Sequence, residues 1–156
     1  MNHLLGGGRN SSLNEELREK RGLVYSVHTY FRLLHRAGTI AGQLATANAS
    51  VGTALDLVRG EWGRMARDGV DADELAAAKR YINGSFPLRL DSTRSIAGML
   101  VAIQLNGLGI DYIDRRPALI DAVTGDDIRR VARRLLSPDR LAIVVVGDPE
   151  GLESTR

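Results

Sequence analysis

The chain of 156 residues contains no cysteine. This absence excludes disulfides, thiol nucleophiles and cysteine-ligated zinc, and it leaves the redox environment open because a cysteine-free chain folds in any compartment. Aromatic residues are few, at 4%. No apolar run approaches the roughly 20 residues that a membrane-spanning helix needs, and the order of a signal peptide is absent from the beginning. We therefore expect no membrane partner.

The chain also lacks an excess of one charge, because its 21 Lys and Arg residues are nearly balanced by 19 Asp and Glu residues. A net charge of +2 gives little long-range attraction to nucleic acid. Four arginines do line one predicted helix, at Arg129, Arg130, Arg133 and Arg134. No aromatic residue accompanies them for base stacking, so a solvated helix face is the better interpretation. We expect no nucleic-acid partner.

Histidine is scarce too, with His3, His28 and His35 as the full set. None belongs to an H-x-x-E-H or H-E-x-x-H motif. His28 and His35 lie on a predicted strand and its turn, where they point to opposite faces and are separated by roughly 20 Å or more. The sequence therefore predicts no metal site and no cofactor in this chain.

What is present predicts strands in three places. The stretch LVYSVHTYFRLLH alternates with a period of two, which places one set of side chains on an apolar face: Leu23, Tyr25, Val27, Thr29, Phe31 and Leu33. A turn at Ala37 and Gly38 leads to TIAGQLATA, an antiparallel partner. The continuous apolar run LAIVVVG, near the end of the chain, indicates a strand inside a covered sheet.

Helical signals fill the remaining chain. MNHLLGGG reads as the end of a helix, and Ser12 with Glu15 has the spacing of a capping box for a helix to about Arg21. Further helices are expected from Val51 until Gly69, from Asp71 toward Phe86, over about 93–106, over about 111–121, and from Thr124 until Ser137. This order predicts an α+β fold: a single domain over 1–156, built as a two-layer sandwich with helices on one face of a mostly antiparallel sheet.

Two short stretches invite functional readings. The loop GGGRNSSL precedes a helix as phosphate-binding loops do, but it lacks the Gly-Lys-Ser/Thr ending and is better interpreted as a turn between helices. The stretch LNEELREKRGLVYSV places Arg18 on a helix and Tyr25 on a strand, across Gly22. Taken from residues alone, Arg18 pairs with Glu15 and Tyr25 belongs to the core.

A resemblance to a known family changes this balance. LGGGRNSSLNEELREKRGLVYSV closely resembles the C-terminal half-domains of the pitrilysin/insulinase family of zinc metallopeptidases, which includes the mitochondrial processing peptidases. The similarity continues through DELAAAKRYINGSFPLRLDS and DYIDRRPALIDAVTGDDIRRVARRLLSPDRLAIVVVGDP, and it is closest to the bacterial type. It implies that zinc is bound by an H-x-x-E-H motif and a Glu on a partner half-domain or subunit, and it favours the periplasm.

The resemblance also implies a role for Arg18 and Tyr25, which have the family's spacing. In this family an Arg and a Tyr reach the substrate backbone near the scissile bond, where they donate to a carbonyl and to the developing oxyanion. We therefore expect a substrate-binding, non-catalytic half-domain of a zinc endopeptidase, with a peptide substrate and no activity alone. The alternative is a proteolytically inactive structural or interaction module of the same family.

One departure from the family pattern concerns the beginning of the chain. Half-domains of the family carry a strand and most of a helix before the LGGG turn, and neither precedes it here. We therefore expect a fragment without its N-terminal strand. A sheet edge left unpaired invites association, so the fragment is expected to form homo-oligomers.

Overall fold

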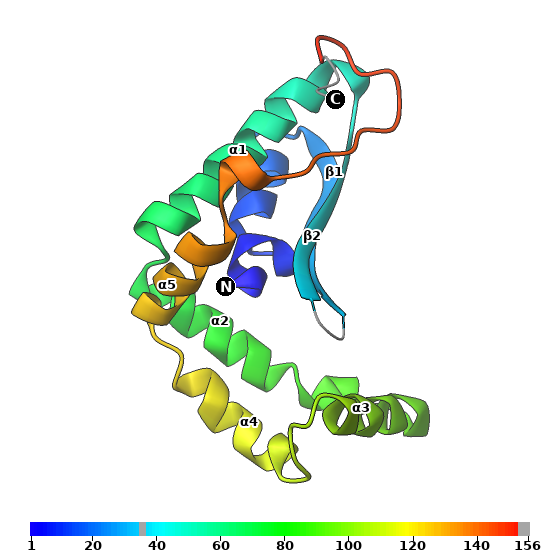
Figure 1. The fold of residues 1–156 in the computed structure, drawn as a ribbon, viewed down its shortest axis with the longest axis vertical. Coiled ribbons are helices and arrows are strands. Elements are labelled where there is room, and N and C mark those ends of the chain that lie inside the picture. The colour runs from blue at the N-terminus through cyan, green and yellow to red at the C-terminus, as the bar shows by residue number, and fades with distance from the viewer. Residues whose placement is uncertain (35–36, 153–156) are drawn as a thin grey trace. The chain divides into compact units, whose positions relative to one another are not determined.

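The computed structural model describes residues 1–34 and 37–152. Its contacts divide into two compact units, one of Met1–Val70 with Asp126–Arg156 and one of Asp71–Gly125. Both units contain helices, and the strands of the described residues lie in the first unit (Figure 1). The predicted α+β class is confirmed. Within the described ranges, no helix is long and apolar enough to cross a membrane.

The sheet of the first unit is an antiparallel hairpin. Strand β1 (Val24–Leu34) pairs with β2 (Ala37–Thr46), and no third strand joins them among the described residues. The predicted turn at Ala37 and Gly38 is wrong, because these residues already pair with Leu34 and Leu33. The connection falls on positions 35–36, which include His35 and lie outside the described residues.

Helices cover one face of this hairpin. Two π-helices, η1 (His3–Gly7) and η2 (Asn14–Glu19), pack on β1, and helix α1 (Val51–Asp68) packs on both of them (Figure 1). The unit also contains η3 (Asn48–Ser50), α5 (Gly125–Leu135) and η5 (Pro138–Arg140). Its core consists of Leu5, Leu13, Leu17, Val24, Val27, Ala54, Trp62, Met65, Ala132 and Leu136. The strand residues of this core, Val24 and Val27, thus lie in the first half of β1.

Helix α1 ends as its sequence predicts. Gly69 adopts a φ of +75°, a left-handed conformation that favours glycine, and its N–H donates to the carbonyl of Met65 at 3.1 Å. The spacing of Ile128, Val131, Ala132 and Leu135 predicts an apolar stripe on α5, and the structure differs at the last of these residues. Leu135 is 44% exposed, whereas Leu136 is buried at 1% and closes the core in its place.

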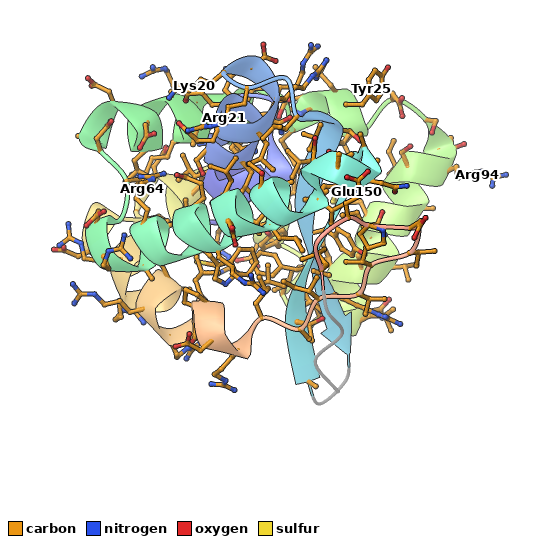
Figure 2. The ribbon with its side chains drawn as sticks, turned by 90° about the horizontal axis from the view of Figure 1, so that it is seen from above. Lys20, Arg21, Tyr25, Arg64, Arg94 and Glu150 are labelled. Carbon is orange, nitrogen blue, oxygen red and sulfur yellow. The ribbon has the colours of Figure 1, made fainter. Side chains whose placement is uncertain are left out.

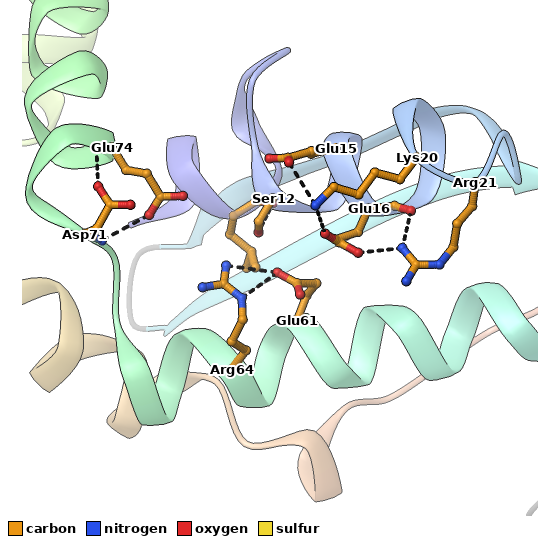
Figure 3. A network of polar contacts seen from close by, with 10 residues as sticks. Ser12, Glu15, Glu16, Lys20, Arg21, Glu61, Arg64, Asp71 and Glu74 are labelled. Carbon is orange, nitrogen blue, oxygen red and sulfur yellow. Dashed lines mark hydrogen bonds and ion pairs between the residues drawn. The ribbon is translucent and has the colours of Figure 1, made fainter.

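The second unit consists of helices, whose bounds agree with the predicted ranges. They are α2 (Ala72–Gly84), η4 (Pro87–Arg89), α3 (Thr93–Leu105) and α4 (Tyr112–Asp121). The spacing of Asp71 and Glu74 predicts a capping box before α2, and the structure confirms it. The Glu74 N–H donates to Asp71 at 2.7 Å, and the Asp71 N–H donates to Glu74 at 3.1 Å (Figure 3). Local side-chain chemistry therefore sets the start of this helix.

Polar contacts join α2 to α4. Lys79 donates to the Asp121 carbonyl at 2.8 Å, and the Asn83 amide donates to the Asp121 carboxylate at 3.0 Å. The guanidinium of Arg116 lies 4.1 Å from the centre of the Phe86 ring, a cation–π contact. These exposed and half-buried contacts, rather than a large core, hold the helices of this unit together.

The predicted strand LAIVVVG is wrong for the described structure. Residues 141–146 carry no strand assignment, and Val144 and Val146 are 89% and 94% exposed. The apolar residues have the propensity for a strand, but a strand exists only where a neighbour supplies the hydrogen-bonding ladder. Among the described residues no such neighbour lies beside this segment.

The predicted capping box at Ser12 and Glu15 is also wrong. Ser12 donates instead to the carbonyl of Leu5 at 3.3 Å, and Glu15 pairs with Lys20 at 2.9 Å. The first helical turn already contains Ser12, because the Glu15 N–H reaches back to the Ser11 carbonyl at 3.0 Å. A residue inside the helix cannot occupy the N-cap position.

Candidate functional site

Tyr25 lies on the surface of the first unit, with 86% of its area exposed (Figure 2). The pairing passes from Val24 with Thr46 to Ser26 with Ala45, so β1 advances by one residue more than β2. This extra residue is a β-bulge, which redirects the side chains that follow it. The predicted apolar face was wrong at this point: Val24 and Val27 are both buried at 5%, and Tyr25 between them points out.

Farther along β1 the predicted face leaves the core. Thr29 is buried at 5%, in agreement with the predicted alternation. Phe31 and Leu33 follow on the same face but are 51% and 72% exposed. Along β1 the buried residues end at Thr29, whose carbonyl accepts a hydrogen bond from Asn2 at 3.1 Å.

Arg18 meets Tyr25 across the end of η2. Its guanidinium carbon lies 5.9 Å from the centre of the Tyr25 ring, within the range of a cation–π contact. The predicted pair of Arg18 with Glu15 does not form, because Glu15 pairs with Lys20, and the nearest carboxylate to Arg18 is that of Glu19 at 3.9 Å. The structure therefore brings together the two residues that the family resemblance singles out.

The connection between the two residues is tightly fixed. Gly22 adopts a φ of +61°, and its N–H donates to the Arg18 carbonyl at 2.9 Å. The next N–H, of Leu23, donates to the Leu17 carbonyl at 2.8 Å. A Cβ on Gly22 would meet nothing within 4 Å, so the position requires glycine for its backbone conformation and not for space.

The other charges of η2 form a separate network (Figure 3). Glu16 accepts hydrogen bonds from Lys20 at 2.6 Å and from Arg21, which also donates to the Glu16 carbonyl at 2.8 Å. These donors, first Lys20 and then Arg21, lower the pKa of Glu16, and Glu16 in turn raises the pKa of Lys20. Lys20 and Arg21 are thus engaged on the helix surface, whereas Arg18 contacts Tyr25.

An open hollow of about 540 Å³ adjoins Tyr25. Its lining residues come from the two strand ends: Gly22, Leu23, Val24, Tyr25, Ala45, Thr46 and Ala47. None of them carries a formal charge at neutral pH. The Thr46 hydroxyl donates to the Leu23 carbonyl at 2.6 Å. Thr46 has no sequence signal, because a threonine at a strand end belongs to no motif and its partner lies 23 residues away.

The other residues considered from sequence have structural surroundings. The amide of Asn14 donates to the carbonyls of Gly8 and Val27, at 3.1 Å each, which ties the glycine turn between η1 and η2 to the sheet. His28 is exposed and stacks on Tyr30 with ring centres 6.0 Å apart. Within residues 1–34 and 37–152, no group of three or more His, Asp or Glu side chains could hold a metal ion.

The arginines of α5 are partly paired with acids of their own helix. Arg129 lies 3.3 Å from Asp126, and Arg130 lies 3.0 Å from Asp127. The guanidinium of Arg133 donates to the carbonyl of Ala66 on α1, at 3.3 Å. These contacts fit the predicted solvated helix face.

Comparisons with known proteins identify the family of the chain. The family model "Peptidase M16 inactive domain" matches residues 1–82. A protein described as an uncharacterized zinc protease from Streptomyces coelicolor is 32% identical over all of this chain, which spans 34% of that relative. A Helicobacter pylori protein described as a non-peptidase homolog is 33% identical over 61% of this chain, which spans 22% of it. A crystal structure of a peptidase M16 inactive domain from Pseudomonas fluorescens superimposes with a TM-score of 0.79 at 28% identity, covering 89% of this chain and 33% of that one.

The chain belongs to the M16, or pitrilysin, family and corresponds to its inactive domain. The resemblance stated from the sequence is confirmed. The chain spans about a third of the length of the bacterial zinc-protease relatives it matches.

Proposed function

We propose that the chain is a substrate-binding, non-catalytic half-domain of a zinc endopeptidase, in which Arg18 and Tyr25 contact the substrate main chain. One observation carries the proposal. The bulge in β1 turns Tyr25 outward, 86% exposed, beside an Arg18 guanidinium at 5.9 Å from its ring. A tyrosine that served only the core would lie on the buried face, and the bulge removes it from that face.

The chemistry of the pair fits peptide binding. An arginine offers a planar set of N–H donors that suits a main-chain carbonyl. A tyrosine hydroxyl can donate to the oxygen that becomes negative when the peptide bond is attacked. Neither group cleaves the bond in this proposal. The zinc and the attacking water belong to a partner half-domain or subunit, and the substrate is a peptide.

A second function has an observation in its favour. The Helicobacter pylori relative is described as a non-peptidase homolog, and a chain of this family can therefore exist without peptidase activity. Under this alternative the domain is a structural or interaction module. The Arg18–Tyr25 contact would then stabilise the end of η2, and its loss would leave any peptidase activity unchanged.

The proposal is tested by joining the chain to a zinc-bearing M16 catalytic half and measuring peptide hydrolysis. We expect Tyr25→Phe to lower kcat/KM by about 10²-fold to 10³-fold, the usual effect of removing one oxyanion donor. Arg18→Ala should also lower kcat/KM, because the substrate main chain loses a donor. Bound zinc and the melting temperature should stay as in the wild type. Equal activity of both variants and the wild type would favour the structural alternative.

Matched controls come from the same strand. Tyr30→Phe removes a hydroxyl from a tyrosine that stacks on His28. Arg32→Ala removes an exposed guanidinium farther along β1. Both variants should retain wild-type activity. A similar loss in these controls would show that the effect belongs to the strand surface in general and not to the Arg18–Tyr25 pair.

A further inference from the structure

We infer that Thr46 is a positioning residue that holds Tyr25 in place over Arg18. The effect of Thr46 on peptide cleavage rests on the proposed function, whereas its effect on the position of Tyr25 does not. Thr46 ends β2 and faces Val24, the last residue of β1 before the bulge. Its hydroxyl donates to the carbonyl of Leu23 at 2.6 Å.

This hydrogen bond joins the connection after η2 to a second element, strand β2. The N–H groups of Gly22 and Leu23 are bonded to carbonyls of the η2 region. Both bonds tie the connection to the helix that carries Arg18. Thr46 donates from β2 to the carbonyl of Leu23, which belongs to the next peptide unit, and so joins the end of the helix to the hairpin.

The bulge makes that additional bond necessary. A bulge residue lies outside the regular ladder, so its direction is not set by pairing with the opposite strand. Tyr25 is also 86% exposed, and packing restrains it little. Leu23 lies two positions before Tyr25, and a bond to its carbonyl restrains the plane of the Leu23–Val24 peptide, through which the chain enters the bulge. The Tyr25 ring thereby keeps its place 5.9 Å from the guanidinium.

The test uses the whole chain in solution and nuclear Overhauser cross-peaks between the Tyr25 ring and the Arg18 side chain. Thr46→Val keeps the shape of the side chain and removes the donor, while Thr46→Ser keeps the donor. We expect Thr46→Val to lose these cross-peaks toward the level of Tyr25→Ala, in which the ring is absent. Thr46→Ser should retain them. Thr39→Val, the same change near the other end of β2, is the matched control and should also retain them.

Two outcomes would overturn the inference. Wild-type cross-peaks in Thr46→Val would show that the hydroxyl is not needed, and equal loss in Thr46→Ser would assign the effect to the methyl group. Trp62 fluorescence reports folding in the same samples. If Thr46→Val does not fold, Thr46→Ala gives the same comparison without the added methyl group.

A second arm separates this inference from the proposed function. In the joined enzyme, Thr46→Val should lower kcat more than it raises KM, and Thr46→Ser should restore kcat. Loss of the cross-peaks with unchanged kcat would support the positioning role of Thr46 and contradict the role of Tyr25 in peptide cleavage. Retained cross-peaks with lowered kcat would contradict the positioning role alone.

Discussion

The two units of the chain are built in different ways. The unit of Met1–Val70 and Asp126–Arg156 contains the main core, with Leu5, Leu17 and Met65 fully buried. The unit of Asp71–Gly125 buries only Ala78, Phe86 and Ile103 among its described apolar residues. On its helix α3, Leu100 and Leu105 are 52% and 82% exposed. One unit is stabilised by long-range packing, and the other depends mainly on local helix signals.

The largest effect expected from this difference concerns association. The outer edge of β1 has no strand beside it among the described residues, and the extended segment 141–146 is apolar and exposed. Unpaired strand edges favour pairing with another chain. We expect light scattering to give about twice the mass of 16.9 kDa. A change of Phe31→Lys on β1 should restore the monomer, whereas Leu105→Lys on α3 should not. A monomer at all concentrations would contradict this expectation.

The second largest effect concerns core packing, because truncating an apolar side chain should destabilise the first unit more than the second. Leu17→Ala removes a side chain with no exposed area from η2, and we expect it to lower the free energy of unfolding by about 2–5 kcal/mol. Leu100→Ala on α3 should change it by less than about 0.5 kcal/mol. Urea denaturation followed by Trp62 fluorescence and by circular dichroism measures both values. Similar losses in the two variants would show that α3 is also part of a packed core.

Loss of a helix cap should destabilise the second unit more than the first. Asp71→Ala removes the N-cap of α2 and should cost about 1 kcal/mol. Ser12→Ala serves as the comparison, because this serine has the same sequence signal but bonds to the Leu5 carbonyl at 3.3 Å. We expect less helix loss from Ser12→Ala in thermal melts followed by circular dichroism. A greater loss from Ser12→Ala would contradict the assignment of the box to Asp71 alone.

The smallest effect belongs to the charge network of η2. The pKa of Glu16 is lowered in the folded chain, so the folded state binds its proton less tightly than the unfolded state. The stability that Glu16 contributes is present above the pKa of the unfolded state and is lost as the pH falls through the pKa of the folded state. We expect Glu16→Gln to reduce this acid-dependent part of the stability by at most about 1 kcal/mol, because its partners are exposed. Urea titration of Glu16→Gln and the wild type at several pH values measures this difference.

The same contrast explains which features could be predicted from the sequence. The starts of α2 and α3 follow from nearby residues, such as Asp71 with Glu74, because a cap and its N–H partners lie within one turn. The end of α1 at Gly69 follows from a glycine conformation in the same way. These signals are local, and the structure agrees with them.

The features that the sequence could not show depend on contacts between distant segments. Alternation predicted Tyr25 on the core face, but the bulge arises from the register of β1 against β2 and has no signal within LVYSV. Propensity predicted a strand at LAIVVVG, but no ladder partner lies beside it in the described residues. The identities of Arg18 and Tyr25 came from family resemblance, and their contact came only from the structure.

The bulge in β1 has a consequence for how this surface can vary. Val24 and Val27 keep their places in the core on either side of it, while Tyr25 is removed from packing. A substitution at position 25 can therefore change the chemistry presented to solvent with little effect on the stability of the fold. Position 25 is therefore constrained by what the side chain binds and not by the packing of the core. Relatives that share the same core can differ at this position.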